Sequence, residues 1–472
     1  MNLNLSDIQM PTENLTTAEK ATLGGRLDRA IFVFTAAAIF VFPLLFIPAL
    51  SSWFDLPKTT LLIAAAGIAA VLWLFKAALG KKITLIRSPF DAPVLVFVAV
   101  SFVSAYFSAN RVMSLVSDPL LYLGGFVLFL VIANTINKER GFLGIIRVFL
   151  GTVAILSLIS FLQMAAMLIN TQVKNPALNL VIFSPTFSAT GSFVTQMMLT
   201  VVALPLALGL YLKNKKVLDG VILGALVLGL MVGILTLYKN PPALLSIETG
   251  WKIATGVLGS SINAAIFGIG PGNYADAFSI FKPIEFNSTT FWTLRFTNGA
   301  NFYFYLLTTI GVAGLAAFLW LVTKLFQVAQ KRLELPTTGA LEKGLIGSLA
   351  VILVMYFFVP GPAVITLALF VLLGLLVAHF NIAQNQALAS PRTLNLPENA
   401  WLDFVPSLLV AGLTLYALVN LFRMITADYF FAQSLAAAAK NQGTQTYNAQ
   451  IKAINLFPEN DTYKGFLRKM CE

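Results

Sequence analysis

This chain of 472 residues is 58% hydrophobic and only 11% charged, which excludes a soluble domain because soluble chains carry about 25% charged residues. Its net charge of +11 would suggest a nucleic-acid ligand in a soluble protein, but here the cations cluster between apolar runs and act as topology signals. One cysteine and one histidine exclude an intrachain disulfide, a cysteine metal cluster and a multi-histidine zinc site.

The chain begins with a polar stretch of mixed charge, residues 1–29, which predicts a cytoplasmic tail. No small-x-small cleavage site follows the first apolar run, so we expect that run to remain as a membrane span. A span needs about 20 predominantly apolar residues. About eleven runs approach this length, near residues 30–50, 59–79, 90–108, 118–134, 142–168, 194–212, 217–238, 302–323, 341–359, 363–381 and 402–423.

These runs predict an all-α fold, a polytopic membrane helix bundle of about eleven spans. A large extracytoplasmic helical loop interrupts the bundle, and a small helical hairpin ends the chain. The predicted segments are the tail 1–29, a bundle of about seven spans at 30–238, the loop 239–301, a bundle of about four spans at 302–423, and a C-terminal tail at 424–472.

The distribution of cations predicts the orientation. Eighteen lysines and arginines lie in connections on the side of the N-terminus, against seven on the opposite side when the C-terminal tail is left out. The positive-inside rule therefore places the N-terminus in the cytoplasm and the loop and C-terminus outside.

A Pro-Gly-Pro sequence at 360–362 leaves open a re-entrant pair in place of two spans. Ion-coupled pumps usually place ionisable residues near the middle of the membrane, whereas here these residues lie near span ends, which argues against such a pump. His379 is expected to have a partner or to snorkel.

The loop 239–301 is long, aromatic and poor in charge. An inert connection is short and polar, so a loop of this kind beside a membrane is more often functional than a spacer. Its large aromatic side chains either form an interfacial belt or pack on sugar rings, and the residues leave both alternatives open. They are Trp251, Phe267, Tyr274, Phe278, Phe281, Phe286, Phe291, Trp292 and Phe296.

Two helices are predicted within the loop. Residues 244–262 have an amphipathic pattern, typical of a helix that lies in the membrane interface. The apolar face of this helix consists of Trp251, Ala254, Leu258 and Ile262. A second, shorter helix follows Asn273, a residue type suited to an N-cap. The apolar stripe of the second helix consists of Tyr274, Ala277, Phe278 and Phe281.

A glycine-rich run, Gly268-Ile-Gly270-Pro-Gly272, separates the two helices. The run lacks the dinucleotide-binding fingerprint and its strand–helix–strand context, so we do not expect it to bind a dinucleotide. One interpretation is a tight turn that lets a helix approach the membrane closely. The other is that backbone N–H groups ahead of the second helix help to bind a diphosphate.

Three sequence features around the loop occur together. They are Trp251, the stretch Phe267-Gly-Ile-Gly270-Pro-Gly272-Asn273-Tyr274, and the stretch Ala300-Asn301-Phe-Tyr303 that continues to Gly311-Val-Ala-Gly314. Together they resemble the O-antigen ligase and polymerase superfamily over about 65 residues. The resemblance implies a glycosyltransferase of the bacterial cytoplasmic membrane. Such an enzyme moves an envelope glycan from a polyprenyl-diphosphate carrier to a lipid or protein acceptor on the extracytoplasmic side, without cofactor, metal or nucleic acid.

The chain departs from the family pattern at three polar positions. The family usually has a histidine where this chain has Ala300, often a glutamate where it has Thr309, and often an arginine where it has Ile247. Arg295 and Lys252 lie near two of these gaps and are candidate replacements. The departures leave open a non-catalytic protein that binds a lipid-linked glycan, or a transporter of one.

The chemistry of glycan transfer assigns roles to loop residues. A leaving diphosphate is stabilised by cations or N–H donors, and the acceptor hydroxyl benefits from a base. Arg295 fits the first role best, because a guanidinium binds a diphosphate through two hydrogen bonds. Glu285 or Asp276 is the candidate base. The predicted catalytic residues are Arg295, Asn301 and Glu285, and the predicted substrate-binding residues are Lys239, Trp251, Lys252, Gly270, Gly272, Asn273, Tyr274, Lys282 and Trp292.

The tail 424–472 is rich in alanine and amphipathic. Tyr429 to Lys440, a turn at Gly443 and the helix-like stretch to Pro458 resemble one tetratricopeptide repeat and the opening of a second. One such unit cannot bury its apolar face alone. The tail therefore docks on the loop or on a protein partner, or it is a plain surface hairpin.

The predicted orientation can be tested with the one thiol of the chain. We expect Cys471 to react with a membrane-impermeant maleimide in intact spheroplasts, because the tail is predicted to lie outside. Labelling that requires permeabilised membranes would contradict both the orientation and the span count.

Overall fold

The computed structural model describes residues 17–173, 183–395 and 402–471, and the start of the predicted cytoplasmic tail lies outside this part. The described residues are 76% helical, so the expected all-α class is confirmed in outline. The first eight helices are α1 (Thr17–Leu44), α2 (Asp55–Leu79), α3 (Asp91–Phe107), α4 (Arg111–Val116), α5 (Asp118–Thr135), α6 (Glu139–Val173), α7 (Phe193–Asn214) and α8 (Val217–Lys239). The remaining helices are α9 (Ile247–Ser260), α10 (Ile262–Phe267), α11 (Tyr274–Phe281), η4 (Ile284–Ser288), α12 (Phe302–Thr309), α13 (Gly311–Leu333), α14 (Ala340–Met355), α15 (Ala363–Ile382), η5 (Leu402–Phe404), α16 (Val405–Ala438), α17 (Gly443–Leu456) and α18 (Asp461–Cys471).

Within the described residues, nine helical segments are long and apolar enough to cross a membrane. The chain is therefore an integral membrane protein. The segments are Leu23–Leu44, Asp55–Leu79, Arg111–Thr135, Glu139–Ile169, Phe193–Asn214, Val217–Lys239, Gly311–Leu333, Ala363–Ile382 and Val405–Ala438. Two predicted spans are shorter here: α3 has 17 residues and α14 has 16, less than the roughly 20 that a straight crossing needs.

The run 302–323, predicted as one span, is divided into α12 and α13. The break falls at Gly311, whose φ of +74° is a conformation that side chains other than glycine rarely adopt. A Cβ atom at this position would lie 2.4 Å from the carbonyl oxygen of Ile266, so the backbone of α10 approaches closely here. The break therefore gives the loop 239–301 a backbone contact with the bundle.

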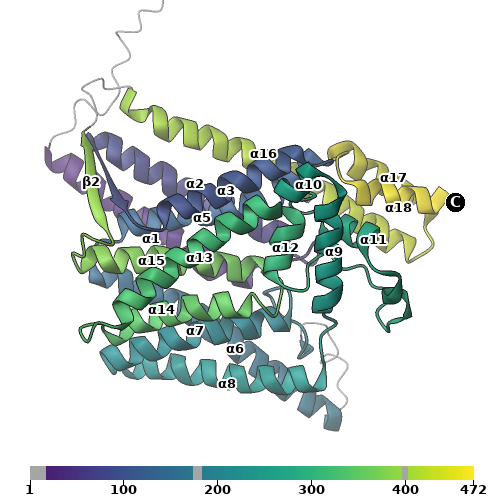
Figure 1. Ribbon diagram of the computed structural model, residues 1–472, viewed down its shortest axis with the longest axis horizontal. Coiled ribbons are helices and arrows are strands. Elements are labelled where there is room, and N and C mark those ends of the chain that lie inside the picture. The colour runs from purple at the N-terminus through teal and green to yellow at the C-terminus, as the bar shows by residue number, and fades with distance from the viewer. Residues whose placement is uncertain (1–16, 174–182, 396–401, 472) are drawn as a thin grey trace, which may run out of the picture.

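The long helices lie alongside one another, and the molecule has two distinct ends (Figure 1). The loop helices α9, α10 and α11 and the tail helices α17 and α18 lie at one end, which we call the loop end. The opposite end carries a two-stranded antiparallel sheet, and we call it the sheet end. Its strands are β1 (Lys82–Arg87) and β2 (Ser390–Asn395).

The sheet is a departure from the predicted all-helical fold. β1 pairs with β2 along its whole length, from Lys82 opposite Asn395 to Arg87 opposite Ser390. The backbone N–H of Ile86 also donates to Oδ1 of Asn134 at the end of α5 (2.7 Å). The β1 sequence suits a short strand, but its pairing partner lies in a distant connection, which local periodicity does not reveal. The sheet joins the α2–α3 connection to the segment before α16.

Burial separates a central helix from a peripheral one. In α15, 89% of an apolar stretch of 18 residues is buried inside the protein, whereas in α16 the buried share of such a stretch is 6%. The Cα of Gly125 in α5 lies against the ring of Phe370, where a Cβ would come within 2.3 Å, so α5 and α15 pack closely. The core of the bundle is thus centred on α15, and α16 presents most of its apolar surface to lipid.

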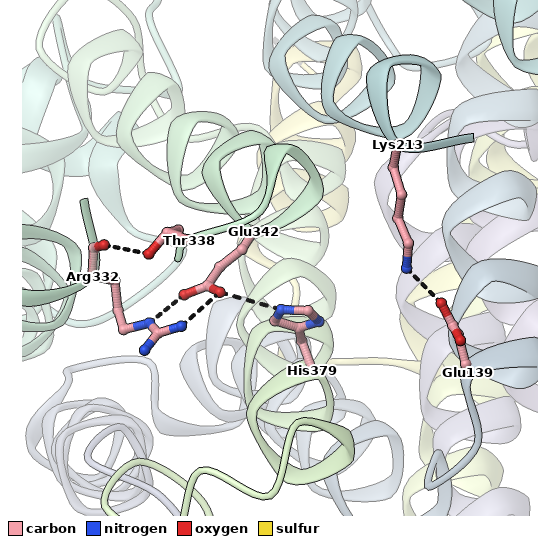
Figure 2. A network of polar contacts seen from close by, with 6 residues as sticks. All are labelled: Glu139, Lys213, Arg332, Thr338, Glu342 and His379. Carbon is pink, nitrogen blue, oxygen red and sulfur yellow. Dashed lines mark hydrogen bonds and ion pairs between the residues drawn. The ribbon is translucent and has the colours of Figure 1, made fainter. Parts of the chain in front are cut away.

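Polar side chains also join the helices near the sheet end (Figure 2). The buried Glu342 carboxylate of α14 accepts hydrogen bonds from Arg332 at 2.5 and 2.9 Å. Nε2 of His379 lies 3.3 Å from the same carboxylate, and its ring stacks on Phe142. The expectation that His379 has a partner is confirmed. Because three helices contribute to this cluster, it fixes α13, α14 and α15 relative to one another.

The contact between α7 and α14 generates a stability prediction. A Cβ at Gly344 would lie 2.6 Å from the carbonyl oxygen of Pro205, so Gly344→Leu must push the helices apart. We expect a loss of at least about 1–3 kcal/mol, the cost of overpacking, measured as a lower apparent Tm in detergent. Gly224→Leu on α8 is the matched control, since a Cβ at that position meets nothing within 4 Å. Equal Tm changes in the two variants would contradict the close packing.

Candidate functional site

A cavity of about 490 Å³ lies at the loop end, where four helices begin. We call it the acidic cavity. Loop residues 297–298 and the Pro-Gly-Pro sequence at 360–362 complete its wall. The first residues of α2, α5, α7 and α15 line it, and the N-terminus of a helix carries free N–H groups and partial positive charge. The lining residues at these four helix starts are Phe54, Asp55, Ser117, Asp118, Ser192, Pro362 and Ala363.

Two carboxylates line the acidic cavity. Asp55 and Asp118 occupy the first position of α2 and α5, where negative charge stabilises a helix. The Asp118 carboxylate accepts hydrogen bonds from the Tyr305 hydroxyl (2.5 Å) and from the backbone N–H of Gly272. Both carboxylates line this one cavity, where their like charges oppose each other. Asp118 is therefore held by groups from the loop and from α12.

One buried cation accompanies this pair. Lys58 is completely buried one turn after Asp55, and its charge attracts that carboxylate. Its Nζ donates to the carbonyl oxygen of Ala189 (2.6 Å) and lies 5.0 Å from the ring centroid of Phe54. Lys58 thus offsets part of the negative charge and ties the segment before α7 to α2.

Hydroxyl groups form much of the remaining wall of the acidic cavity. Hydroxyls both donate and accept hydrogen bonds, and carboxylates accept them, so the lining suits a ligand rich in hydroxyl groups. The hydroxyl-bearing residues are Ser52, Thr59, Ser117, Tyr122, Thr190, Ser192, Thr195, Thr297, Tyr305 and Thr366. Among the described residues, the lining includes no lysine or arginine.

The glycine run is a turn of close backbone approach. Gly268, Gly270 and Gly272 all have positive φ, and the N–H of Gly270 donates to the carbonyl oxygen of Thr309 (3.0 Å). A Cβ at Gly270 would lie 2.4 Å from the side chain of Ser108, and one at Gly272 would lie 2.7 Å from Oγ of Ser117. These contacts favour the tight-turn interpretation of the run. Of the twelve predicted site residues, all of them described, Gly272 is the one that lines the acidic cavity.

The two residues after the run have structural contacts. Nδ2 of Asn273 donates to Oγ of Ser108 and of Ser114, each at 2.8 Å, and its side chain does not cap α11. Tyr274 is buried beside Tyr305, and this burial raises the pKa of its hydroxyl. The predicted apolar stripe on this helix is found, since Tyr274, Ala277 and Phe278 are buried.

None of the four predicted loop cations lines the acidic cavity. Nη2 of Arg295 lies 2.7 Å from Oδ1 of Asp276, with both side chains more than half exposed. Lys252 pairs with Glu248 one turn away on α9 (2.8 Å), which lowers the pKa of that glutamate. Lys239 is exposed at the end of α8. Lys282 lies over the rings of two phenylalanines, Phe278 and Phe286.

The remaining predicted site residues, Asn301, Glu285, Trp292 and Trp251, also lie outside the acidic cavity. Oδ1 of Asn301 accepts from the N–H of Phe304 (2.8 Å), so Asn301 is the N-cap of α12. Glu285 is exposed in η4, and Trp292 is 61% exposed. Trp251 is 49% exposed and its ring lies 5.4 Å from that of Phe304.

The predicted helix 244–262 is present as α9, but its buried face differs from the predicted one. Ile253, Ala254 and Val257 are buried, whereas Trp251 and Ile262 are exposed. The helix packs on the bundle through one face and leaves a second apolar face outside. This second face suits contact with the membrane interface.

Sequence reasoning missed Asp55, Lys58 and Asp118. A signal for the two aspartates is present: each immediately precedes a long apolar run and has a proline within two residues, as in Asp55-Leu-Pro57 and Asp118-Pro119. That pattern marks a helix start at a membrane boundary. It does not reveal that the two helix starts share one cavity.

Comparison with known proteins adds no relative. A search of protein-family models finds none that matches this chain, and a search of curated proteins finds no match. The resemblance to the O-antigen ligase and polymerase superfamily therefore stands on the loop residues alone.

The position of the family histidine gives a test of the packing around Ala300. This residue is buried, and its Cβ lies only 2.6 Å from where a Cβ on Gly250 of α9 would be. We expect Ala300→His to destabilise the protein by about 1–3 kcal/mol rather than to supply a base, measured as a lower apparent Tm. Thr293→His at an exposed loop position is the control. Higher turnover with an unchanged Tm in Ala300→His would show that the histidine is accommodated.

Proposed function

We propose that this protein transfers or polymerises a glycan from a polyprenyl-diphosphate carrier onto a lipid or protein acceptor. The reaction takes place at the extracytoplasmic face of a bacterial cytoplasmic membrane. The observation that carries the proposal is the acidic cavity, a hydroxyl-lined space that holds two carboxylates and is partly walled by the loop that resembles the transferase superfamily. Without that resemblance, the cavity alone would indicate only a polar ligand.

The proposed orientation puts the N-terminus and the sheet end in the cytoplasm. Cations gather at the sheet end, which favours this side under the positive-inside rule. They include Lys81, Lys82 and Arg87 around β1, Lys213, Lys215 and Lys216 between α7 and α8, and Arg392 in β2. With α3 and α14 crossing as short spans, the proposed count is eleven. The loop and the tail then lie outside, where lipid-linked glycans are used.

The proposed reaction is a substitution at the anomeric carbon of the donor sugar. An acceptor hydroxyl oxygen forms a bond to that carbon while the bond from the carbon to the diphosphate oxygen breaks. The proton of the hydroxyl passes to the Asp118 carboxylate, which acts as the general base, and the polyprenyl diphosphate leaves with the bonding electron pair. Asp118 suits this role because it lines the cavity and is positioned by Tyr305 and Gly272.

The leaving diphosphate requires positive charge or N–H donors. The helix starts around the acidic cavity supply N–H groups, and helix N-termini are common binding sites for phosphate. Lys58 adds positive charge behind the wall. Asp55 then accepts hydrogen bonds from sugar hydroxyls. These assignments replace the loop cations, which lie outside the acidic cavity.

An active site in the acidic cavity and an active site on the loop predict opposite effects for two variants. If the reaction occurs in the acidic cavity, Asp118→Asn lowers turnover by about 10² or more, because the base is lost. Arg295→Ala then changes turnover by no more than a few fold, since its exposed ion pair contributes little. Turnover is measured with purified lipid-linked glycan and acceptor in detergent, with Tm as a folding control.

Glu285→Gln is the matched carboxylate control, because Glu285 is exposed on the loop and lies outside the acidic cavity. A large loss in Arg295→Ala with little effect of Asp118→Asn would place the site on the loop, as first predicted. Movement of an unmodified carrier across proteoliposomes without transfer would favour a transporter. Binding of the carrier with neither transfer nor movement would favour a non-catalytic protein.

A further inference from the structure

A second cavity, of about 630 Å³, lies between the bundle, the loop and the tail. We call it the tail cavity. Three separate parts of the chain form its wall: the connection from α3 to α4, the glycine run with α11, and the start of α18. The lining residues are Ala109, Asn110, Arg111, Val112, Ile269, Asn273, Asp276, Ile280, Glu459 and Lys464.

The tail is fixed to the bundle, so its contribution to this wall is permanent. Nδ2 of Asn110 donates to the carbonyl oxygen of Glu459 (2.9 Å). Asp428 of α16 accepts from the backbone N–H of Ser52 (2.9 Å) and from the hydroxyl of Ser51. Buried Phe431 and its neighbours pack against the α4 side chains. The tail thus docks on the bundle, and the tail cavity is a built feature of the fold.

The chemical character of the tail cavity differs from that of the acidic cavity. It contains the cations Arg111 and Lys464, and Arg295 lies at its edge through the ion pair with Asp276. The guanidinium of Arg111 stacks over the ring of Tyr106, with 4.8 Å between its carbon and the ring centroid. Such stacking holds the guanidinium plane in place and leaves its edge free to bind a carboxylate.

Planar polar groups and small apolar surfaces alternate along the wall. Asn110, Asn273 and Asp276 offer amide and carboxylate groups, and Ile269 and Ile280 offer apolar surface. Sugars present the complementary combination, hydroxyl edges and C–H faces, and a charged sugar adds a partner for arginine.

The glycine run separates the two cavities. Gly272 lines the acidic cavity and the next residue, Asn273, lines the tail cavity. The two cavities therefore lie on either side of the glycine run, and Gly272 on the acidic side faces the carboxylate of Asp118. This short separation is what an acceptor site needs, since the acceptor must reach the donor sugar.

We propose that the tail cavity binds the acceptor as an acidic saccharide, with a sugar carboxylate on Arg111 and sugar hydroxyls on Asn273 and Asp276. This inference rests on the proposed function for its place in the reaction. Binding itself is measurable without turnover, so the two can fail separately.

The test is equilibrium binding of tetragalacturonate to the purified full-length protein in detergent. We expect saturable binding that weakens with added salt, and no comparable binding of neutral maltotetraose. Arg111→Gln should weaken binding about tenfold or more, because a charged hydrogen bond is lost. Arg111→Lys should restore little of it. Lys252→Gln, exposed on α9 and outside the cavity, is the matched control and should bind normally.

Ile280→Trp gives a second variant in case Arg111→Gln fails to fold. It fills the cavity from an exposed position without changing charge, and it should also abolish binding. Asp118→Asn should bind tetragalacturonate normally even if it is inactive. Binding that is absent, or equal for the neutral sugar, or unaffected by both Arg111→Gln and Ile280→Trp, overturns the inference. Asp118-dependent turnover together with such a result would leave the proposed function standing.

Discussion

The close approach of two glycines holds the loop against the bundle, and the site geometry depends on it. Gly268 and Gly311 both have positive φ, and a Cβ on Gly311 would lie 2.6 Å from the backbone nitrogen of Gly268. No larger side chain fits between these backbones. The hydroxyl of Ser104 fastens the same point by donating to the carbonyl oxygens of Phe267 and Thr309. Gly272, four residues after Gly268, is thereby positioned against Asp118.

The sequence predicted the features that depend on local pattern. The spans follow from apolar length, and the second loop helix follows from the spacing of Tyr274, Ala277 and Phe278, all buried as expected. The tight turn at the glycine run was one of two interpretations that the sequence left open, and positive φ at its glycines favours it. His379 was expected to be satisfied, and its partner Glu342 is one helix earlier.

The sequence did not predict what distant segments form together. Asp118 and Tyr305 are 187 positions apart, and no periodicity links them. The two paired strands of the sheet are even farther apart in the sequence. Two of the loop cations that are conspicuous in the sequence, Arg295 and Lys252, form ion pairs with Asp276 and Glu248. The buried Lys58 was counted as a topology signal, although its ammonium group is bound inside the protein.

The length of α16 has a consequence for where the tail operates. At 1.5 Å per residue its 34 residues extend about 51 Å, whereas the hydrocarbon layer of a bilayer is about 30 Å thick. A helix that begins near one membrane surface therefore emerges from the other by about 20 Å, beyond most of the lipid headgroups. The C-terminal end of α16 thus extends beyond the bilayer and places α17 and α18 in the aqueous phase. A molecule reaching the tail can arrive by diffusion through water, while a lipid-linked molecule reaches the bundle by moving within the membrane plane.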